Sequence, residues 1–157
     1  MKQVKKEINE FLVETFNDIL KIEESTLKKS PYSNVTMKEF HLLETVYRRG
    51  KNNGDNTAGA IAKELRVTPG TLTTAVKLLE KKGYLKRLKD AKDKRSVHIV
   101  VTKLGEKANV DHQKFHNDMV EDVISVLSED ESKAFLKGLK TLGDFFEQQD
   151  KKINKIN

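Results

Sequence analysis

The apolar residues of this chain recur mainly at helical spacing, which predicts a mainly α-helical protein. One amphipathic pattern covers residues 2–28 and ends at Pro31, and a second begins at a capping box in residues 36–39 and ends at Gly50. Two further helices are expected after Gly105, the second of them beginning at a capping box in residues 128–131.

Two short helices are predicted in the middle of the chain. The first covers residues 57–67 and is expected to turn inward its apolar residues Ala58, Ile61, Ala62 and Leu65. The second begins at Thr68-Pro69, because Thr68 can cap a helix and Pro69 has no amide hydrogen to leave unpaired. Gly83 is expected to end it.

A basic hairpin follows these helices, with strands expected in residues 84–90 and 96–102. Two short helices joined by a tight turn and followed by a basic hairpin are typical of a winged helix-turn-helix. The sequence therefore predicts a mainly α fold with about six helices and a two-stranded β-wing.

The chain is expected to form a single domain over residues 1–157. The winged-helix DNA-binding part would cover about residues 31–104, flanked by dimerisation helices at about 2–29 and 105–150. Each terminal helix carries an apolar stripe too wide for one small domain to cover. A second copy of the chain would cover both stripes, so we expect a homodimer.

The helix that begins at Thr68 has two distinct faces at about 100° per residue. Its inward face contains Leu72, Ala75, Val76 and Leu79. The side chains of its outward face are mostly small and able to form hydrogen bonds. Together with the capping residue they are the predicted DNA contacts: Thr68, Gly70, Thr71, Thr73, Thr74 and Lys77. Such a face suits the major groove, because threonine offers hydroxyls to phosphates or bases and a methyl to thymine. The alternative is an ordinary solvated face.

Positive charge is concentrated in the same part of the chain. The formal net charge is +6, and residues 57–103 hold 12 Lys/Arg against 4 Asp/Glu, a net +8. This asymmetry favours double-stranded DNA as the partner, the alternative being a solvated lysine-rich surface. At the hairpin tip, Lys92, Lys94 and Arg95 are expected to reach the minor groove, and Asp93 to hold the tip in shape.

Several classes of protein are excluded or disfavoured by what the sequence lacks. It contains no cysteine, so disulfides, thiolate metal sites and cysteine nucleophiles are excluded. We expect no enzyme, because no Gly-rich phosphate loop, G-x-S-x-G or H-E-x-x-H motif is present. No apolar run approaches about 18 residues, so we expect a cytoplasmic protein without membrane contact. An architectural DNA binder without sequence preference stays open.

The stretch VTPGTLTTAVKLLEKKGYLKRLKDAKDKRSVHIVVTKLG, residues 67–105, resembles the signature region of the MarR family of bacterial transcriptional regulators. The shared features are a recognition helix ending in LEKKG, a wing with D-x-x-D-[KR]-R, and the segment VTKLG that follows the second strand. Lys94 departs from the pattern, since arginine is common there, and lysine offers a point charge rather than a planar fork.

Within that family, the chain resembles the repressors of fatty-acid biosynthesis in VTPGTLTTAV, KGYLKR, VHIVVT, KEFH (38–41) and KFHNDMVE (114–121). The resemblance implies a homodimeric repressor of fatty-acid synthesis genes that binds a palindromic operator. It also implies long-chain acyl-acyl carrier protein as co-repressor and no bound cofactor. The acyl chain would lie in an apolar cavity whose candidate walls are Phe16, Phe40, Leu43, Phe115 and Met119, although side chains of this kind are more often plain core.

A zinc-responsive regulator is the alternative. His112 and His116 stand four residues apart on one helix face, and with Glu24 and His41 they resemble the ligand set of zinc-responsive members of the family. Without metal, the same histidines would line the dimer interface.

Replacing Lys94 or Arg95 by alanine should weaken binding to all duplexes similarly, because a wing contact to the DNA backbone carries no sequence information. The slope of log K against log salt should fall by about one for each cation removed. Anisotropy titrations at several salt concentrations measure both quantities. A loss confined to one sequence would contradict the wing assignment.

Overall fold

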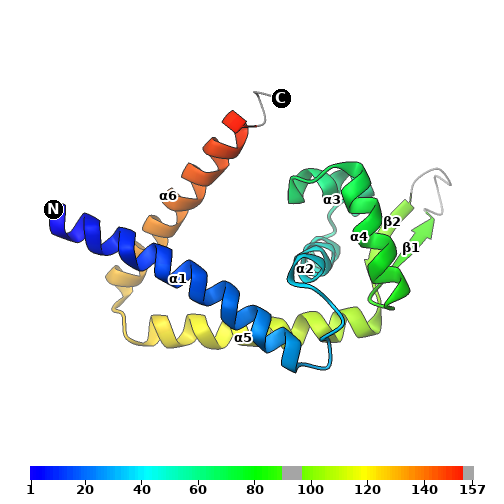
Figure 1. Ribbon diagram of the computed structural model, residues 1–157, viewed down its shortest axis with the longest axis horizontal. Helices are drawn as coiled ribbons and strands as arrows, with labels where there is room; N and C mark the ends of the chain where they lie inside the picture. The colour runs from blue at the N-terminus through cyan, green and yellow to red at the C-terminus, as the bar shows by residue number, and fades with distance from the viewer. Residues whose placement is uncertain (90–96, 154–157) are drawn as a thin grey trace. The chain divides into compact units, whose positions relative to one another are not determined.

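The computed structural model describes residues 1–89 and 97–153 (Figure 1). Within these residues the chain forms six helices and one two-stranded antiparallel sheet. In chain order they are α1 (Lys2–Lys29), α2 (Met37–Lys51), α3 (Ala58–Leu65), α4 (Pro69–Lys81), β1 (Leu85–Lys89), β2 (Val97–Val101), α5 (Lys103–Ser125) and α6 (Glu129–Ile153). The mainly α winged-helix fold predicted from the sequence is confirmed.

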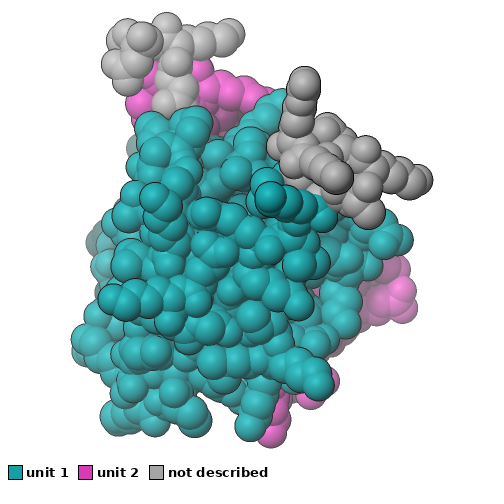
Figure 2. Space-filling model, turned by 90° about the vertical axis from the view of Figure 1, so that its right-hand side faces the viewer, with its two compact units in different colours: residues 1–111 teal, residues 112–157 magenta. Residues whose placement is uncertain are grey.

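The chain divides into two compact units, residues 1–111 and residues 112–157, coloured separately in Figure 2. Unit 1 contains α1 to α4, the sheet and the first part of α5. Unit 2 contains the rest of α5, together with α6. None of the helices within residues 1–89 and 97–153 combines the length and the apolar character needed to cross a membrane.

Side-chain caps determine where α2 begins, as the sequence predicts. The amide of Thr36 donates to Glu39 Oε2 at 2.8 Å, and the amide of Glu39 donates to Thr36 Oγ1 at 3.3 Å. This is a complete capping box. Val35 and Phe40 on either side of the cap are both buried, consistent with a hydrophobic staple. The helix ends at Lys51, one residue beyond the predicted Gly50.

The turn between α3 and α4 is tight. Arg66 ends α3 in the left-handed conformation, with φ of 54°, and α4 begins three residues later at Pro69 with Thr68 as its cap. Ile61 and Ala62 of α3 are buried as predicted, but Ala58 is exposed. The inward prediction for Ala58 was wrong because this first residue of α3 faces a surface pocket instead of the core.

The core of unit 1 lies between α2, α3, α4 and the sheet. The inward face of α4 is confirmed, since Leu72, Val76 and Leu79 are no more than 1% exposed. These side chains join others that are almost fully buried: Phe40, Leu43, Val46, Ile61, Leu85 and Ile99. Burying an aliphatic or aromatic side chain of this size contributes about 1.5–3 kcal/mol, so this core holds α4 against α2, α3 and the sheet.

The two strands meet α5 at the base of the hairpin. Leu85 pairs with Val101 at the base of the hairpin, and Lys89 pairs with Val97 at its other end. Just beyond the Leu85–Val101 pair, the amide of Thr102 donates to the Tyr84 carbonyl at 3.0 Å. The Thr102 hydroxyl donates to the Gly83 carbonyl at 2.6 Å. The start and end of the hairpin are therefore joined directly to each other.

The prediction that a helix begins after Gly105 was wrong, because α5 begins at Lys103. The amide of Gly105 donates to the Thr102 hydroxyl at 3.2 Å, so Thr102 caps the helix. Gly105 is needed for a different reason: a β-carbon there would lie 2.2 Å from the Tyr84 carbonyl oxygen. The glycine permits a close approach between α5 and the hairpin base.

The second predicted capping box is confirmed, since the amide of Ser128 donates to Glu131 Oε2 at 2.8 Å and the amide of Glu131 donates to Ser128 Oγ at 3.4 Å.

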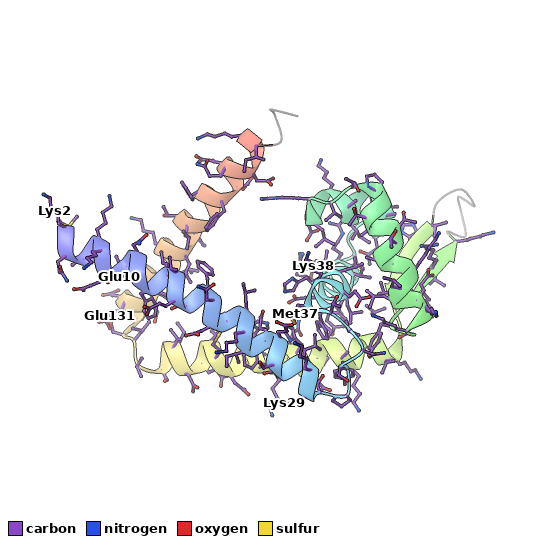
Figure 3. All side chains as sticks on the ribbon, in the orientation of Figure 1. Lys2, Glu10, Lys29, Met37, Lys38 and Glu131 are labelled. Atoms are coloured by element: carbon purple, nitrogen blue, oxygen red, sulfur yellow. The ribbon has the colours of Figure 1, made fainter. Side chains whose placement is uncertain are left out.

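Both terminal helices carry exposed apolar side chains. On α1, along which Figure 3 labels Lys2, Glu10 and Lys29, these include Val4, Ile8, Phe11, Phe16 and Leu20. On α6 they include Phe135, Leu139, Phe145 and Phe146.

Replacing Gly105 by alanine should lower the free energy of unfolding by about 1–3 kcal/mol or more, because the added methyl would overlap a backbone carbonyl. Urea denaturation followed by circular dichroism measures this change. Gly59 in α3 is the matched control, since a β-carbon there meets nothing within 4 Å. Gly59→Ala should be neutral or stabilising by up to about 1 kcal/mol. Equal midpoints for the two variants would contradict the close contact at Gly105.

Candidate nucleic-acid interface

The outward face of α4 is available to a partner. Gly70, Thr71, Thr73, Thr74 and Lys77 are all exposed, as the helical wheel predicts. In Figure 1, α4 and the pair β1–β2 lie next to each other, and contacts between α4 and β1 confirm that they are neighbours. The predicted recognition residues therefore lie on one side of a helix that is held beside the hairpin.

The N-terminus of α4 is capped by threonine. The amide of Thr71 donates to Thr68 Oγ1 at 3.2 Å, and the two threonine hydroxyls share a hydrogen bond of 2.8 Å. A β-carbon added at Gly70 would meet nothing within 4 Å, so packing does not require glycine there. The positive end of the helix dipole and the missing side chain suit the close approach of a phosphate oxygen.

Thr73 and Thr74 both direct their hydroxyl protons toward the helix itself. Thr73 Oγ1 donates to the Pro69 carbonyl at 2.8 Å, and Thr74 Oγ1 donates to the Gly70 carbonyl at 3.1 Å. With the proton engaged, each side chain offers oxygen lone pairs and a methyl group to a partner. This set can accept a hydrogen bond from a base amino group or contact the methyl of thymine.

A small pocket lies between α3, α4 and the sheet. Its volume is about 230 Å³, and its walls come from Ala58, Leu72, Thr73, Val76, Arg87, Val97 and Ile99. Arg87 Nε lies 3.4 Å from Glu80 Oε2, which joins β1 to α4 through an ion pair. The pocket is largely apolar.

Exposed cations on β1 were not among the predicted contacts. After buried Leu85, the strand exposes Lys86, Arg87, Leu88 and Lys89. The sequence carried a signal for them, because a strand that does not alternate and is rich in cations has little to bury. The predicted wing contacts Lys92, Asp93, Lys94 and Arg95 lie outside the described residues.

An ion-pair network supports the preceding helix. Glu64 on α3 pairs with both Arg48 and Arg49 at the end of α2, and the Arg49 guanidinium also donates to the Asp55 carbonyl. Burial raises the pKa of Glu64, but the hydrogen bonds from Arg49 and Arg48 outweigh this effect, so the pKa is lowered. The network therefore holds α3 against α2 throughout the neutral pH range.

The candidate effector residues are found in two kinds of environment. Phe40 and Leu43 are core residues of unit 1, exposed by only 1% and 0%. Phe16 on α1 is 46% exposed, and Phe115 and Met119 on α5 are partly buried. Their roles toward an effector stay predictions.

The candidate zinc ligands belong to both units. In unit 2, the Nε2 atoms of His112 and His116 are 2.9 Å apart. In unit 1, His41 is exposed, and Glu24 pairs with Lys28 at 2.9 Å. The two histidines are thus close enough to share one proton or one ion.

Three known proteins show what this chain resembles. FabT of Streptococcus pneumoniae, solved in complex with DNA, is 38% identical with a TM-score of 0.82, over 92% of this chain and 99% of FabT. The uncharacterised HTH-type transcriptional regulator YkoM of Bacillus subtilis (strain 168) is 30% identical over 122 residues, 78% of this chain and 77% of YkoM. YwhA of the same strain, also an uncharacterised HTH-type transcriptional regulator, is 28% identical over 95 residues, 60% of this chain and 66% of YwhA.

The sequence profile of the MarR family matches residues 35–97, which run from the start of α2 into β2. Family and fold are those of transcriptional regulators rather than of enzymes. Because this profile matches and the likeness to FabT covers 92% of the chain, the chain belongs to the MarR family of transcriptional regulators.

Proposed function

We propose that this regulator is a homodimeric, sequence-specific repressor of fatty-acid biosynthesis genes, with long-chain acyl-acyl carrier protein as its co-repressor. The observation that carries the proposal is the exposed threonine-rich face of α4 on a chain that is 38% identical to FabT, which was solved in complex with DNA. Threonine oxygens and methyls, with Lys77, provide contacts to base edges, and the cations of β1 provide contacts to phosphates.

Exposed apolar surface supports the homodimer. Phe11 on α1 is 66% exposed, and Phe145 and Phe146 on α6 are each 51% exposed. A second copy that covers these side chains would recover about 25 cal/mol for each Å² of apolar area removed from water. Two recognition helices related by two-fold symmetry would then read half-sites about one helical turn apart.

The fatty-acid assignment is supported by the resemblance of VTPGTLTTAV, KGYLKR and VHIVVT to the fatty-acid biosynthesis repressors. These segments correspond to the start of α4, β1 and β2. Among the candidate effector residues, Phe16, Phe115 and Met119 are not fully buried, so an acyl chain that contacts these side chains need not open the core.

A zinc-responsive regulator is the second candidate, favoured by the pair His112–His116. Two imidazole nitrogens bound to one tetrahedral Zn²⁺ lie about 3.4 Å apart, close to the 2.9 Å between these Nε2 atoms. Competition between metal-free protein and a chromophoric zinc chelator decides between the two. Nanomolar affinity that is lost in His112→Ala and His116→Ala would favour zinc sensing.

Two experiments test the proposal. Sedimentation at micromolar concentration should give a dimer, and a monomer would refute the homodimer. Band shifts should show a preference for fatty-acid synthesis promoter DNA over shuffled duplex that changes when acylated carrier protein is added. Unacylated carrier protein is the control. Equal binding to both duplexes would support an architectural DNA binder, and no response to the acylated protein would refute the co-repressor.

Replacing Thr73 or Thr74 by alanine should reduce the preference for operator over shuffled duplex by about 1–3 kcal/mol, because each removes a base-edge acceptor. Anisotropy titrations with both duplexes measure the preference. Thr141→Ala in α6 is the matched control, since Thr141 makes the same bond to the carbonyl four residues earlier, at 3.0 Å. A control that loses as much preference would show that the effect comes from the helix bond instead of the DNA contact.

A further inference from the structure

One carboxylate joins the start of α2 to the end of the recognition helix. Lys82 Nζ donates to both oxygens of Glu39, each at 2.7 Å. Glu39 immediately follows Met37 and Lys38, which Figure 3 labels at the start of α2. Lys82 is the C-cap of α4, and 43 residues separate the two partners along the chain.

This ion pair is largely shielded from water. The side chain of Glu39 is 8% exposed and that of Lys82 is 26% exposed. Burial raises the pKa of Glu39, but hydrogen bonds from Lys82 and from Thr36 outweigh that effect, so the pKa is lowered. A buried pair of this kind fixes geometry more than it adds stability, because desolvation offsets much of the attraction.

Lys82, the C-cap of α4, stands where the chain turns into the hairpin. Its amide donates to the Leu78 carbonyl at 3.0 Å, and Gly83 follows with φ of 83°. The lysine side chain is therefore attached to the helix end that leads directly into β1. A shift of Lys82 would move both the C-terminal turn of α4 and the base of the hairpin.

We propose that Glu39 and Lys82 are positioning residues for DNA recognition. Their ion pair fixes the rotation and tilt of α4 against α2, so that Thr73, Thr74 and Lys77 meet base edges in register. Neither residue need touch DNA. The inference rests on the proposed function, because it requires a preferred duplex against which the positioning can be measured.

The capping box makes the ion pair separable from folding. Glu39 Oε2 also accepts from the amide of Thr36 at 2.8 Å and from its hydroxyl at 3.1 Å. Glutamine can make the same cap, so Glu39→Gln removes the charge while α2 keeps its start. Lys82→Met keeps the aliphatic stem, and Lys82→Arg restores a cation that can pair with the carboxylate.

Glu39→Gln separates positioning from charge, because the two effects have opposite signs. It makes the protein more positive by one charge, so electrostatics alone would leave binding unchanged or tighten it for every duplex. Positioning predicts about tenfold weaker binding to the duplex that the wild type selects from a randomised pool. Binding to a shuffled duplex should not weaken.

Lys82→Met needs a control for its lost charge, and neighbouring Lys81, exposed at the end of α4, provides one. Lys81→Met should weaken both duplexes equally. Lys82→Met should weaken binding to the selected duplex about tenfold more than binding to the shuffled one. Lys82→Arg should return the ratio of the two affinities to within about threefold of the wild-type ratio. Circular dichroism and urea unfolding confirm that each variant is folded.

The deciding quantity is the ratio of the affinity for the selected duplex to the affinity for the shuffled duplex. The inference would be overturned if this ratio were unchanged in Glu39→Gln and Lys82→Met. It would also be overturned if Lys81→Met and Lys82→Met gave the same ratio. If Glu39→Gln does not fold, the comparison of Lys82→Met, Lys82→Arg and Lys81→Met decides the matter by the same ratios. A wild type that selects no duplex would refute the proposed function itself. The two failures are therefore distinguishable.

Discussion

The backbone around Tyr84 is where the recognition helix, the hairpin and α5 are held together. Its amide donates to the Leu79 carbonyl at 2.9 Å, its carbonyl accepts from the amide of Thr102 at 3.0 Å, and Gly105 leaves α5 in contact with that carbonyl. These are backbone positions, so no side-chain rotation can relax them. The arrangement of α4 beside the hairpin, and with it the candidate interface, depends on this close approach.

Charge and apolar surface are distributed differently along the chain. Residues 57–103 carry a net +8, whereas residues 104–157 hold 8 Lys/Arg against 11 Asp/Glu. The exposed apolar side chains are concentrated on the terminal helices, with Phe11 on α1 and Phe145 on α6 more than half exposed. A polyanion is attracted by the first segment, while apolar association suits the terminal helices. Under the proposed function, binding DNA and assembling a dimer would therefore use different parts of the chain.

The features that the sequence predicted well are local ones. The caps at Thr36, Thr68 and Ser128 involve partners three residues away, and the two faces of α4 follow from helical spacing alone. The features it missed depend on contacts distant in sequence. Ala58 faces a pocket formed with α4 and the sheet, and Glu39 pairs with a lysine 43 residues away. A hydrophobic pattern in the sequence indicates that a residue can be buried. It does not indicate which distant residues will pack against it.

An effector can change DNA binding only if it has different affinities for two conformations of the protein, one of which binds DNA more tightly. Within unit 1, the contacts that connect α5 to the rest include Gly105 against the Tyr84 carbonyl, an ion pair of 3.2 Å between Lys51 and Glu106, and Asp111 Oδ2, which accepts from the Tyr32 hydroxyl at 2.5 Å. Tyr32 in turn lies edge-on to Tyr84, with ring centroids 6.4 Å apart. A displacement of α5 would therefore reach the hairpin base by two routes, and through Gly83 it would reach the end of α4. Under the proposed function, a ligand that displaces the unit-1 part of α5 would need no direct contact with the recognition helix to alter its position.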